Sequence, residues 1–380
     1  MIRLAFIAAP AVIVAGCTCN QDYAFPKMQD VVVEGVAADG PWLSLDTAPG
    51  GEALTMTFYD RENGGCAFAI GTPTAAGDVK WAYEKVDGYA GDDGLDRADR
   101  GMYSSHKVAP DGTVWVAYRD VVNGGLFAAQ RTAPHVWEVH NVEIAAGAGH
   151  WASLALDADG KPVIAHYNTD SRTLLVSRTN SEGWSTETAH TGAENAGLGD
   201  TGVPFSNPAD VGEYAKIYIY EGVEYIAFYD RAWGTLNLLE GGSGDYAHTQ
   251  VDNQGDVGQW PSIWTDGSQL RIAYHDITNQ QLLMAVRNSG GWTRATIDSD
   301  DYTGADSEMF EIDGKLGVVY FDGFNNDQKL ARLDGGDWST ETIDGDGVAV
   351  GFHNEAAYAA GKWWLASYDF TNHALSIGSL

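Results

Sequence analysis

The segment Ala227-Phe228-Tyr229-Asp230 is one copy of a short motif, rich in aromatic residues and closed by Asp or Asn, that recurs along the chain. The seven copies occupy residues 57–60, 117–120, 165–168, 227–230, 273–276, 319–322 and 366–369. Their last residues lie 60, 48, 62, 46, 46 and 47 positions apart, so the unit has about 46 residues, with two longer intervals. This length matches one four-stranded blade of a β-propeller.

Each unit divides into runs of strand length, as the fifth copy illustrates. Its runs cover 260–264, 270–275, 282–287 and 292–297, with Asp266-Gly267 and Ser289-Gly290-Gly291 as turns between them. β-branched and aromatic residues dominate these runs, and no helical period persists along the chain. The sequence therefore predicts an all-β protein.

The two ends of the chain complement each other. The seventh unit starts at Gly351 and reaches Leu380 after only three strands, whereas residues 28–35 align residue for residue with 338–345, the fourth strand of the sixth unit. An N-terminal strand over 28–33 would complete blade seven and remove an open sheet edge. We predict a single seven-bladed β-propeller of four-stranded blades over residues 27–380; the strand count leaves six or eight blades as alternatives.

The first residues have the composition of an export signal. Arg3 precedes a short apolar run over 4–14, and small residues then lead to Cys17. The segment Val14-Ala15-Gly16-Cys17 resembles the lipobox of bacterial lipoproteins, which implies cleavage before Cys17, lipidation of that residue and a place in the cell envelope. Residues 1–16 are then the signal peptide and 17–26 the lipidated Cys with its tether. Ordinary signal-peptidase cleavage is the alternative.

The charge and cysteine content narrow the range of partners. The 380-residue chain carries 53 acidic and 22 basic residues, a formal net charge of −31, which repels a phosphate backbone and excludes nucleic acid as a partner. Its three cysteines are too few for a disulfide framework. We expect a monomer whose contact with the membrane is the lipid anchor.

The repeat also predicts which face of the propeller carries function. Neighbouring strands in a blade are antiparallel, so each first strand begins on the face where the second strand ends. The long segments 88–100 and 191–211 connect blades on that same face, which we name the loop face. Insertions on one face of a repeat protein usually mark its binding face.

Several features together resemble the sialidase-like (BNR-type) seven-bladed propellers of secreted bacterial lipoproteins. They are the Gly-x-Trp-x-Ser openings at 40–44, 149–153 and 258–262, the Asp-Gly first turn and the Tyr-Asp end of the second strand. The resemblance implies a propeller related to sialidases, polysaccharide lyases, lectins and proteins without known activity. The chain lacks the Arg-Ile-Pro start and the Asp-box of sialidases, so sialidase activity is not expected.

Two groups of side chains are candidates for a site on the loop face. The opening aromatics pack at the channel mouth or stack on sugar rings: Trp42, Tyr103, Trp151, Tyr214 and Trp260. Polar residues that depart from the repeat are the binding or catalytic candidates: His106, Tyr118, Arg119, Lys216, Arg231, His275, Glu308, His353 and Glu355. Asp306 also replaces an opening aromatic. The motif Asp recurs in almost every blade and is expected to bind turn amides.

These residues favour a protein that binds a ligand on the loop face. The ligand is either an anionic or polar glycan or another surface protein. The alternative is a carbohydrate-active enzyme on the same face, either a polysaccharide lyase or a sialidase-like glycosidase. For a lyase, His106, Tyr118 and Arg119 facing His275 would be the acid–base set. No cofactor is required. Asp92, Asp93 and Asp96, with Asp99, form either a calcium loop or a solvated acidic loop.

Overall fold

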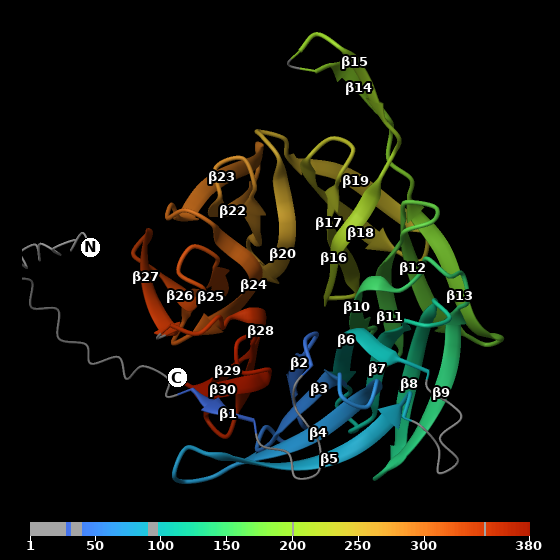
Figure 1. The fold of residues 1–380 in the computed structure, drawn as a ribbon, viewed down its shortest axis with the longest axis vertical. Helices are drawn as coiled ribbons and strands as arrows, with labels where there is room; N and C mark the ends of the chain where they lie inside the picture. Colours follow the sequence, from blue (N-terminus) through green and yellow to red (C-terminus); the bar gives the residue numbers. More distant parts are fainter. Residues whose placement is uncertain (1–27, 32–39, 90–97, 200, 346) are drawn as a thin grey trace, which may run out of the picture.

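The computed structural model describes residues 28–31, 40–89, 98–199, 201–345 and 347–380. Seven four-stranded antiparallel sheets surround a central axis, which confirms the predicted seven-bladed propeller (Figure 1). The first strand of each blade lies nearest the axis and the fourth lies on the outside (Figure 1). Within the described residues, no helix is long and apolar enough to cross a membrane.

The strands of the first four blades follow one another in sequence order. Blade one has β2 (Ser44–Thr47), β3 (Leu54–Asp60), β4 (Gly65–Pro73) and β5 (Val79–Asp87). Blade two has β6 (Arg100–Val108), β7 (Val114–Asp120), β8 (Leu126–Ala133) and β9 (Val136–Glu143). Blade three has β10 (His150–Leu156), β11 (Pro162–Asn168), β12 (Thr173–Asn180) and β13 (Gly183–His190). Blade four has β16 (Val211–Tyr220), β17 (Val223–Asp230), β18 (Thr235–Gly242) and β19 (Asp245–Asp252).

The remaining blades repeat this order, with one exception at the chain ends. Blade five has β20 (Val257–Thr265), β21 (Leu270–Asp276), β22 (Gln281–Asn288) and β23 (Gly291–Asp298). Blade six has β24 (Thr303–Ile312), β25 (Lys315–Asp322), β26 (Asp327–Asp334) and β27 (Asp337–Asp344). Blade seven has β28 (Phe352–Ala359), β29 (Lys362–Asp369), β30 (Ala374–Ser379) and, from the N-terminal end, β1 (Gln29–Asp30).

The N-terminal strand closes the ring as predicted, but in a different register. Gln29 pairs with Ile377, and the Val31 amide donates to the Leu375 carbonyl at 2.7 Å. Ile377 occupies the position of Leu330 in blade six, and Leu330 pairs with Glu341. Gln29 therefore corresponds to Glu341, whereas the sequence alignment placed it on Ser339, so the predicted alignment is wrong by two residues. A slip of two keeps every side chain on its own face, so the apolar alternation could not detect it. Residues 32 and 33 lie outside the described part.

Apolar side chains of adjacent blades form the core. At the closure, Phe58 of blade one and Trp364 of blade seven belong to one buried cluster that includes Val31. Burying a large apolar side chain stabilises a fold by about 1.5–3 kcal/mol, so each blade depends on its neighbours for much of its stability.

The motif carboxylates close the turns between second and third strands, as expected. Asp120 Oδ1 accepts hydrogen bonds from the amides of Val122 and Asn123 at 3.0 and 2.8 Å, and Oδ2 accepts from the Asn123 side chain at 3.1 Å. Asp60, Asp276, Asp322 and Asp369 likewise accept from the backbone amide and the side chain of the Asn three residues on. The recurrence of this residue is therefore structural.

The long segment between blades three and four contains a separate hairpin, β14 (Asn195–Leu198) and β15 (Pro204–Asn207). It projects away from the ring (Figure 1). At its base, the Trp233 indole donates to the Ala193 carbonyl at 3.0 Å, and the Asn195 side chain donates to the Ala232 carbonyl at 2.6 Å. The hairpin is thus fixed to the loop face of blade four.

Candidate functional site

Each blade begins with a five-residue opening equivalent to residues 40–44. The third residue of each opening points to one central cavity on the loop face. The seven equivalent residues line it: Trp42, Tyr103, Trp151, Tyr214, Trp260, Asp306 and His353. All seven are half-buried and have φ between 47° and 62°, the left-handed region that non-glycine residues rarely adopt. In six blades the register of the inner strand shifts across this position. Such a bulge redirects a side chain, and strained backbone of this kind clusters at functional sites.

The ring side chains contact each other around the cavity. Ring centroids are 5.3 Å apart for Trp42 and Tyr103, 4.9 Å for Trp151 and Tyr214, and 4.7 Å for Tyr214 and Trp260. His353 adjoins Trp42 at 5.8 Å, and its Nδ1 lies 3.9 Å from Asp306 Oδ1. The cavity they enclose has a volume of about 160 Å³, which is small for a ligand site and suits one small group.

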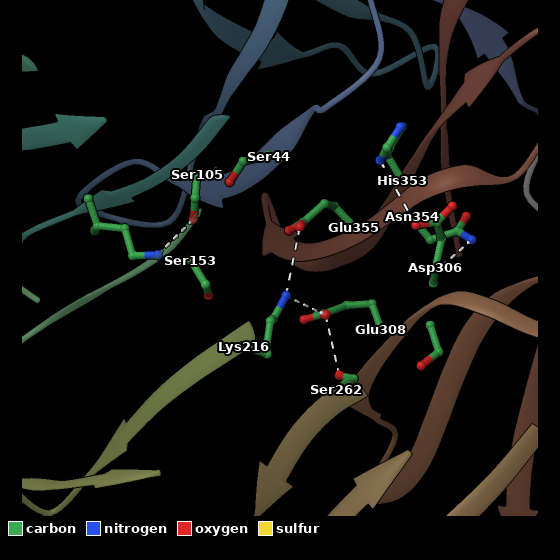
Figure 2. A network of polar contacts seen from close by, with 12 residues as sticks. Ser44, Ser105, Ser153, Lys216, Ser262, Asp306, Glu308, His353, Asn354 and Glu355 are labelled. Carbon is green, nitrogen blue, oxygen red and sulfur yellow. Dashed lines mark hydrogen bonds and ion pairs between the residues drawn. The ribbon is translucent and has the colours of Figure 1, made fainter. Parts of the chain in front are cut away.

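A charged layer forms the floor of this cavity, made by the fifth residues of three openings (Figure 2). Lys216 Nζ lies 2.9 Å from Glu308 Oε2 and 3.9 Å from Glu355 Oε1, and the Ser262 hydroxyl donates to Glu308 at 3.3 Å. The Lys216 side chain is 32% exposed and the two glutamates are each 19% exposed. The three charges come from blades four, six and seven and meet only because the ring closes.

Burial shifts the acid–base behaviour of this layer. Burial raises the pKa of Glu355 to about 7; the nearby Lys216 ammonium opposes this shift and Glu308 adds to it. Burial alone would lower the pKa of Lys216, but the two carboxylates outweigh it and raise that pKa. Glu355 therefore exchanges a proton near neutral pH beside a fixed ammonium.

The serines at the same position in other blades have a structural role. Ser105 Oγ accepts a hydrogen bond from the Leu154 amide at 3.0 Å, and Ser153 Oγ accepts one from the Ile217 amide at 3.1 Å. Each joins one inner strand to the next, as Ser262 does with Met309 at 2.8 Å. Serine is thus the default residue at this position, and the charged residues mark where the ring is specialised.

A second cavity, of about 480 Å³, lies on the other side of the charged layer. It shares Lys216, Glu308 and Glu355 with the first cavity and extends toward the opposite face, where Tyr218 and Trp264 line it. The charged layer therefore separates two hollow parts of the central channel.

The predicted site residues fall into three groups. Lys216, Glu308, His353, Glu355 and the five aromatics line the loop-face cavity. Arg119, Arg231 and His275 lie beside it without lining it. Arg119 donates to the carbonyls of Ala146 and Ala148, Arg231 forms two bonds of 2.7 Å to Glu213, and His275 Nδ1 donates to the Thr303 carbonyl at 2.8 Å.

His106 and Tyr118 form the third group, which the structure places away from the cavity. His106 is fully buried between blades one and two, where its ring nitrogens contact Thr55 Oγ1 at 2.9 Å and Ser44 Oγ at 3.0 Å. His106 directly follows the opening of its blade. The same position is apolar in the other blades because that side of the strand faces the neighbouring blade. The predicted role of His106 in binding or catalysis is therefore corrected to a core histidine.

Tyr118 is also fully buried, and its hydroxyl donates to Asp87 at 2.7 Å. The equivalent Tyr274 and Tyr320 donate to Asp252 and Asp298 in the same way. Tyr118 is thus a repeated structural residue, and the acid–base set expected of a polysaccharide lyase is not assembled.

Asp306 also belongs to the site, although in the sequence it marks only a break in the repeat. Its place in the opening, equivalent to Trp42 and Trp260, was the available signal.

Asp92, Asp93 and Asp96 lie outside the described residues, so calcium binding there stays a prediction. Asp99 accepts a hydrogen bond from Tyr59 at 2.6 Å, and the described residues contain no group of three or more potential metal ligands.

No protein-family model matches the sequence, and no curated protein matches it. Among solved structures, the chain is similar to polysaccharide lyase Uly1, with a TM-score of 0.56, 10% identity, and 96% of this chain and 93% of that chain covered. The Aleuria aurantia lectin has a TM-score of 0.47 at 13% identity, covering 80% of this chain and 96% of that one. A leech intramolecular trans-sialidase has a TM-score of 0.47 at 12% identity, covering 93% and 70%. At these identities the similarity is one of fold.

Proposed function

We propose that this protein is a carbohydrate-binding propeller that holds one sugar residue in the loop-face cavity. The observation that carries the proposal is the run of five aromatics from successive blades, each held by left-handed backbone around a cavity with a polar floor. Aromatic faces pack against the apolar C–H faces of sugars, while carboxylate, ammonium and hydroxyl groups bind sugar hydroxyls. The small volume suits the end residue of a glycan rather than a long internal segment.

A glycan array followed by titration calorimetry tests this proposal. We expect Trp151→Asn and Trp260→Asn to weaken glycan binding by about tenfold or more, because each removes one stacking face. Asn is chosen because it tolerates left-handed backbone and so leaves the fold intact. Phe324→Asn is the matched control, since Phe324 is 67% exposed and does not line the cavity. Equal binding by all three variants, or no glycan ligand at all, would contradict the proposal.

A glycoside hydrolase is the second candidate, and the Glu355–Lys216–Glu308 layer is the observation that favours it. A carboxyl group with a pKa near 7 can act as a general acid beside an ionised partner. If the site is catalytic, Glu355→Gln abolishes turnover of the glycan that binds but preserves its binding. A wild-type protein that leaves every bound glycan intact excludes this candidate.

We also propose that the chain is exported and anchored to the bacterial cell envelope by a lipid on Cys17. The support is the segment 14–17 and its resemblance to a lipobox. The Cys17→Ser variant should lose incorporation of labelled fatty acid and leave the membrane fraction, whereas the neighbouring Cys19→Ser should retain both. Membrane retention of Cys17→Ser would overturn the anchor.

A further inference from the structure

Acidic side chains outnumber basic ones among the charged residues that line the loop-face cavity. Three carboxyl groups, on Asp306, Glu308 and Glu355, face one ammonium, on Lys216. This ammonium is already bound to Glu308 at 2.9 Å and lies 3.9 Å from Glu355, so it is paired within the lining; the Lys107 ammonium also acts on Glu355 but lines the second cavity. The lining therefore has an excess of negative charge.

Asp306 contributes most directly to this excess. Its nearest basic group is His353, whose Nδ1 is 3.9 Å away. Burial lowers the pKa of His353, and Asp306 only partly opposes the shift, so this ring is uncharged at neutral pH. Among the residues that the structure describes, no arginine lines the cavity: Arg119 is bound to backbone carbonyls and Arg231 to Glu213.

The walls above the floor also attract positive charge. Five aromatic rings with centroids 4.7–5.7 Å apart follow one another from Trp42 to Trp260, and the Asp306 carboxyl completes the ring toward His353. The face of an aromatic ring is electrostatically negative and binds ammonium groups. An anionic sugar would meet three carboxyl groups here, so the anionic saccharide considered from the sequence is disfavoured.

We infer that the group bound in this cavity carries a protonated amine, as in the residue of an amino sugar with a free amino group. The inference rests on the proposed carbohydrate function and specifies the class of sugar that the cavity binds. The ammonium would lie among the aromatic rings and next to Asp306, while the sugar hydroxyls reach the floor. A free alkylammonium ion has the same binding chemistry, so the experiment includes one.

The test compares four probes by titration calorimetry: a glucosamine tetrasaccharide, its N-acetylated form, a galacturonate tetrasaccharide and choline. We expect the amine form to bind at least about tenfold more tightly than the N-acetylated form and the uronate not to bind. Asp306→Asn should weaken binding of the amine form about fivefold or more and leave the N-acetylated form unchanged. Asn keeps the left-handed backbone at this position.

The control variant is Asp301→Asn, which removes one exposed carboxylate from the connection preceding the same blade and does not touch the cavity. It should bind all probes as the wild type does; a loss equal to that of Asp306→Asn would attribute the effect to net charge and overturn the inference. Equal or tighter binding of the neutral or acidic sugar overturns the inference but supports carbohydrate binding. Binding of choline alone, weakened by Asp306→Asn, supports the ammonium site and overturns the carbohydrate function. Binding of no probe overturns the inference, and the glycan array then decides the carbohydrate function.

Discussion

At the scale of single residues, Glu355 is the group whose protonation should control stability near neutral pH. Its folded pKa of about 7 lies above the ordinary 4.5, so the folded protein retains a proton that the unfolded chain has lost. The free energy of unfolding therefore falls as pH rises from about 4.5 to about 7 and levels off above that range. Burial is the first cause, and Glu308 reinforces it.

The Glu355→Gln substitution tests this directly. Gln does not titrate and can still accept the Leu45 amide hydrogen bond that Glu355 receives. We expect the variant to match the wild type at about pH 5 and to be more stable by roughly 1–3 kcal/mol at about pH 8, measured by urea unfolding. Burial also raises the pKa of Asp230 to about 6, so the unfolding free energy of both proteins still falls somewhat as the pH rises to about 6. Identical pH profiles would show that Glu355 is not the titrating group.

At the scale of the structural element, the turn between second and third strands depends on a carboxylate paired with an asparagine. Asp276 accepts from the Asn279 amide at 3.0 Å and from its side chain at 2.8 Å. Asp276→Asn would set two NH₂ donors against each other, so we expect a loss of about 1–2 kcal/mol in thermal or urea unfolding.

Blade three provides the natural control for that substitution. It has Asn168 at the motif position, and the third residue after it is Ser171, whose amide donates to Asn168 at 3.1 Å. The double variant Asp276→Asn/Asn279→Ser reproduces this pair and should recover about half of the lost stability. A double variant as unstable as the single one would rule out the donor conflict as the cause.

At the scale of the whole molecule, two N-terminal residues and their neighbour Val31 join the ends of a ring of seven blades. Val31 is 5% exposed, and Leu375 and Ile377 beside it are fully buried. Deleting residues 28–31 would uncover them and leave β30 as an unpaired edge, which promotes pairing between chains. We expect a loss of several kcal/mol in unfolding free energy and association visible by size-exclusion chromatography.

Removal of the β14–β15 hairpin is the matched deletion, since its residues are almost entirely exposed. It should leave the melting temperature nearly unchanged, because little apolar surface is buried by that hairpin. If both deletions have equally small effects, the ring does not depend on β1 for closure.

The sequence by itself determined the four-stranded unit, the closure by the N-terminal end and the gathering of the opening aromatics on one face, and it favoured seven blades over six or eight. Each of these follows from a repeat, because residues at one repeat position must occupy one layer around the axis. The same logic, applied to the alternation of side chains along the inner strand, would also have placed His106 between blades rather than in the channel. Only the tertiary structure decided the rest. The slip of two residues at β1 is invisible to a period of two, and the bulge that turns Asp306 and the aromatics inward depends on local backbone geometry. Lys216 meets Glu308 and Glu355 across 92 and 139 residues of sequence, because closing the ring is what brings blades four, six and seven to a common axis.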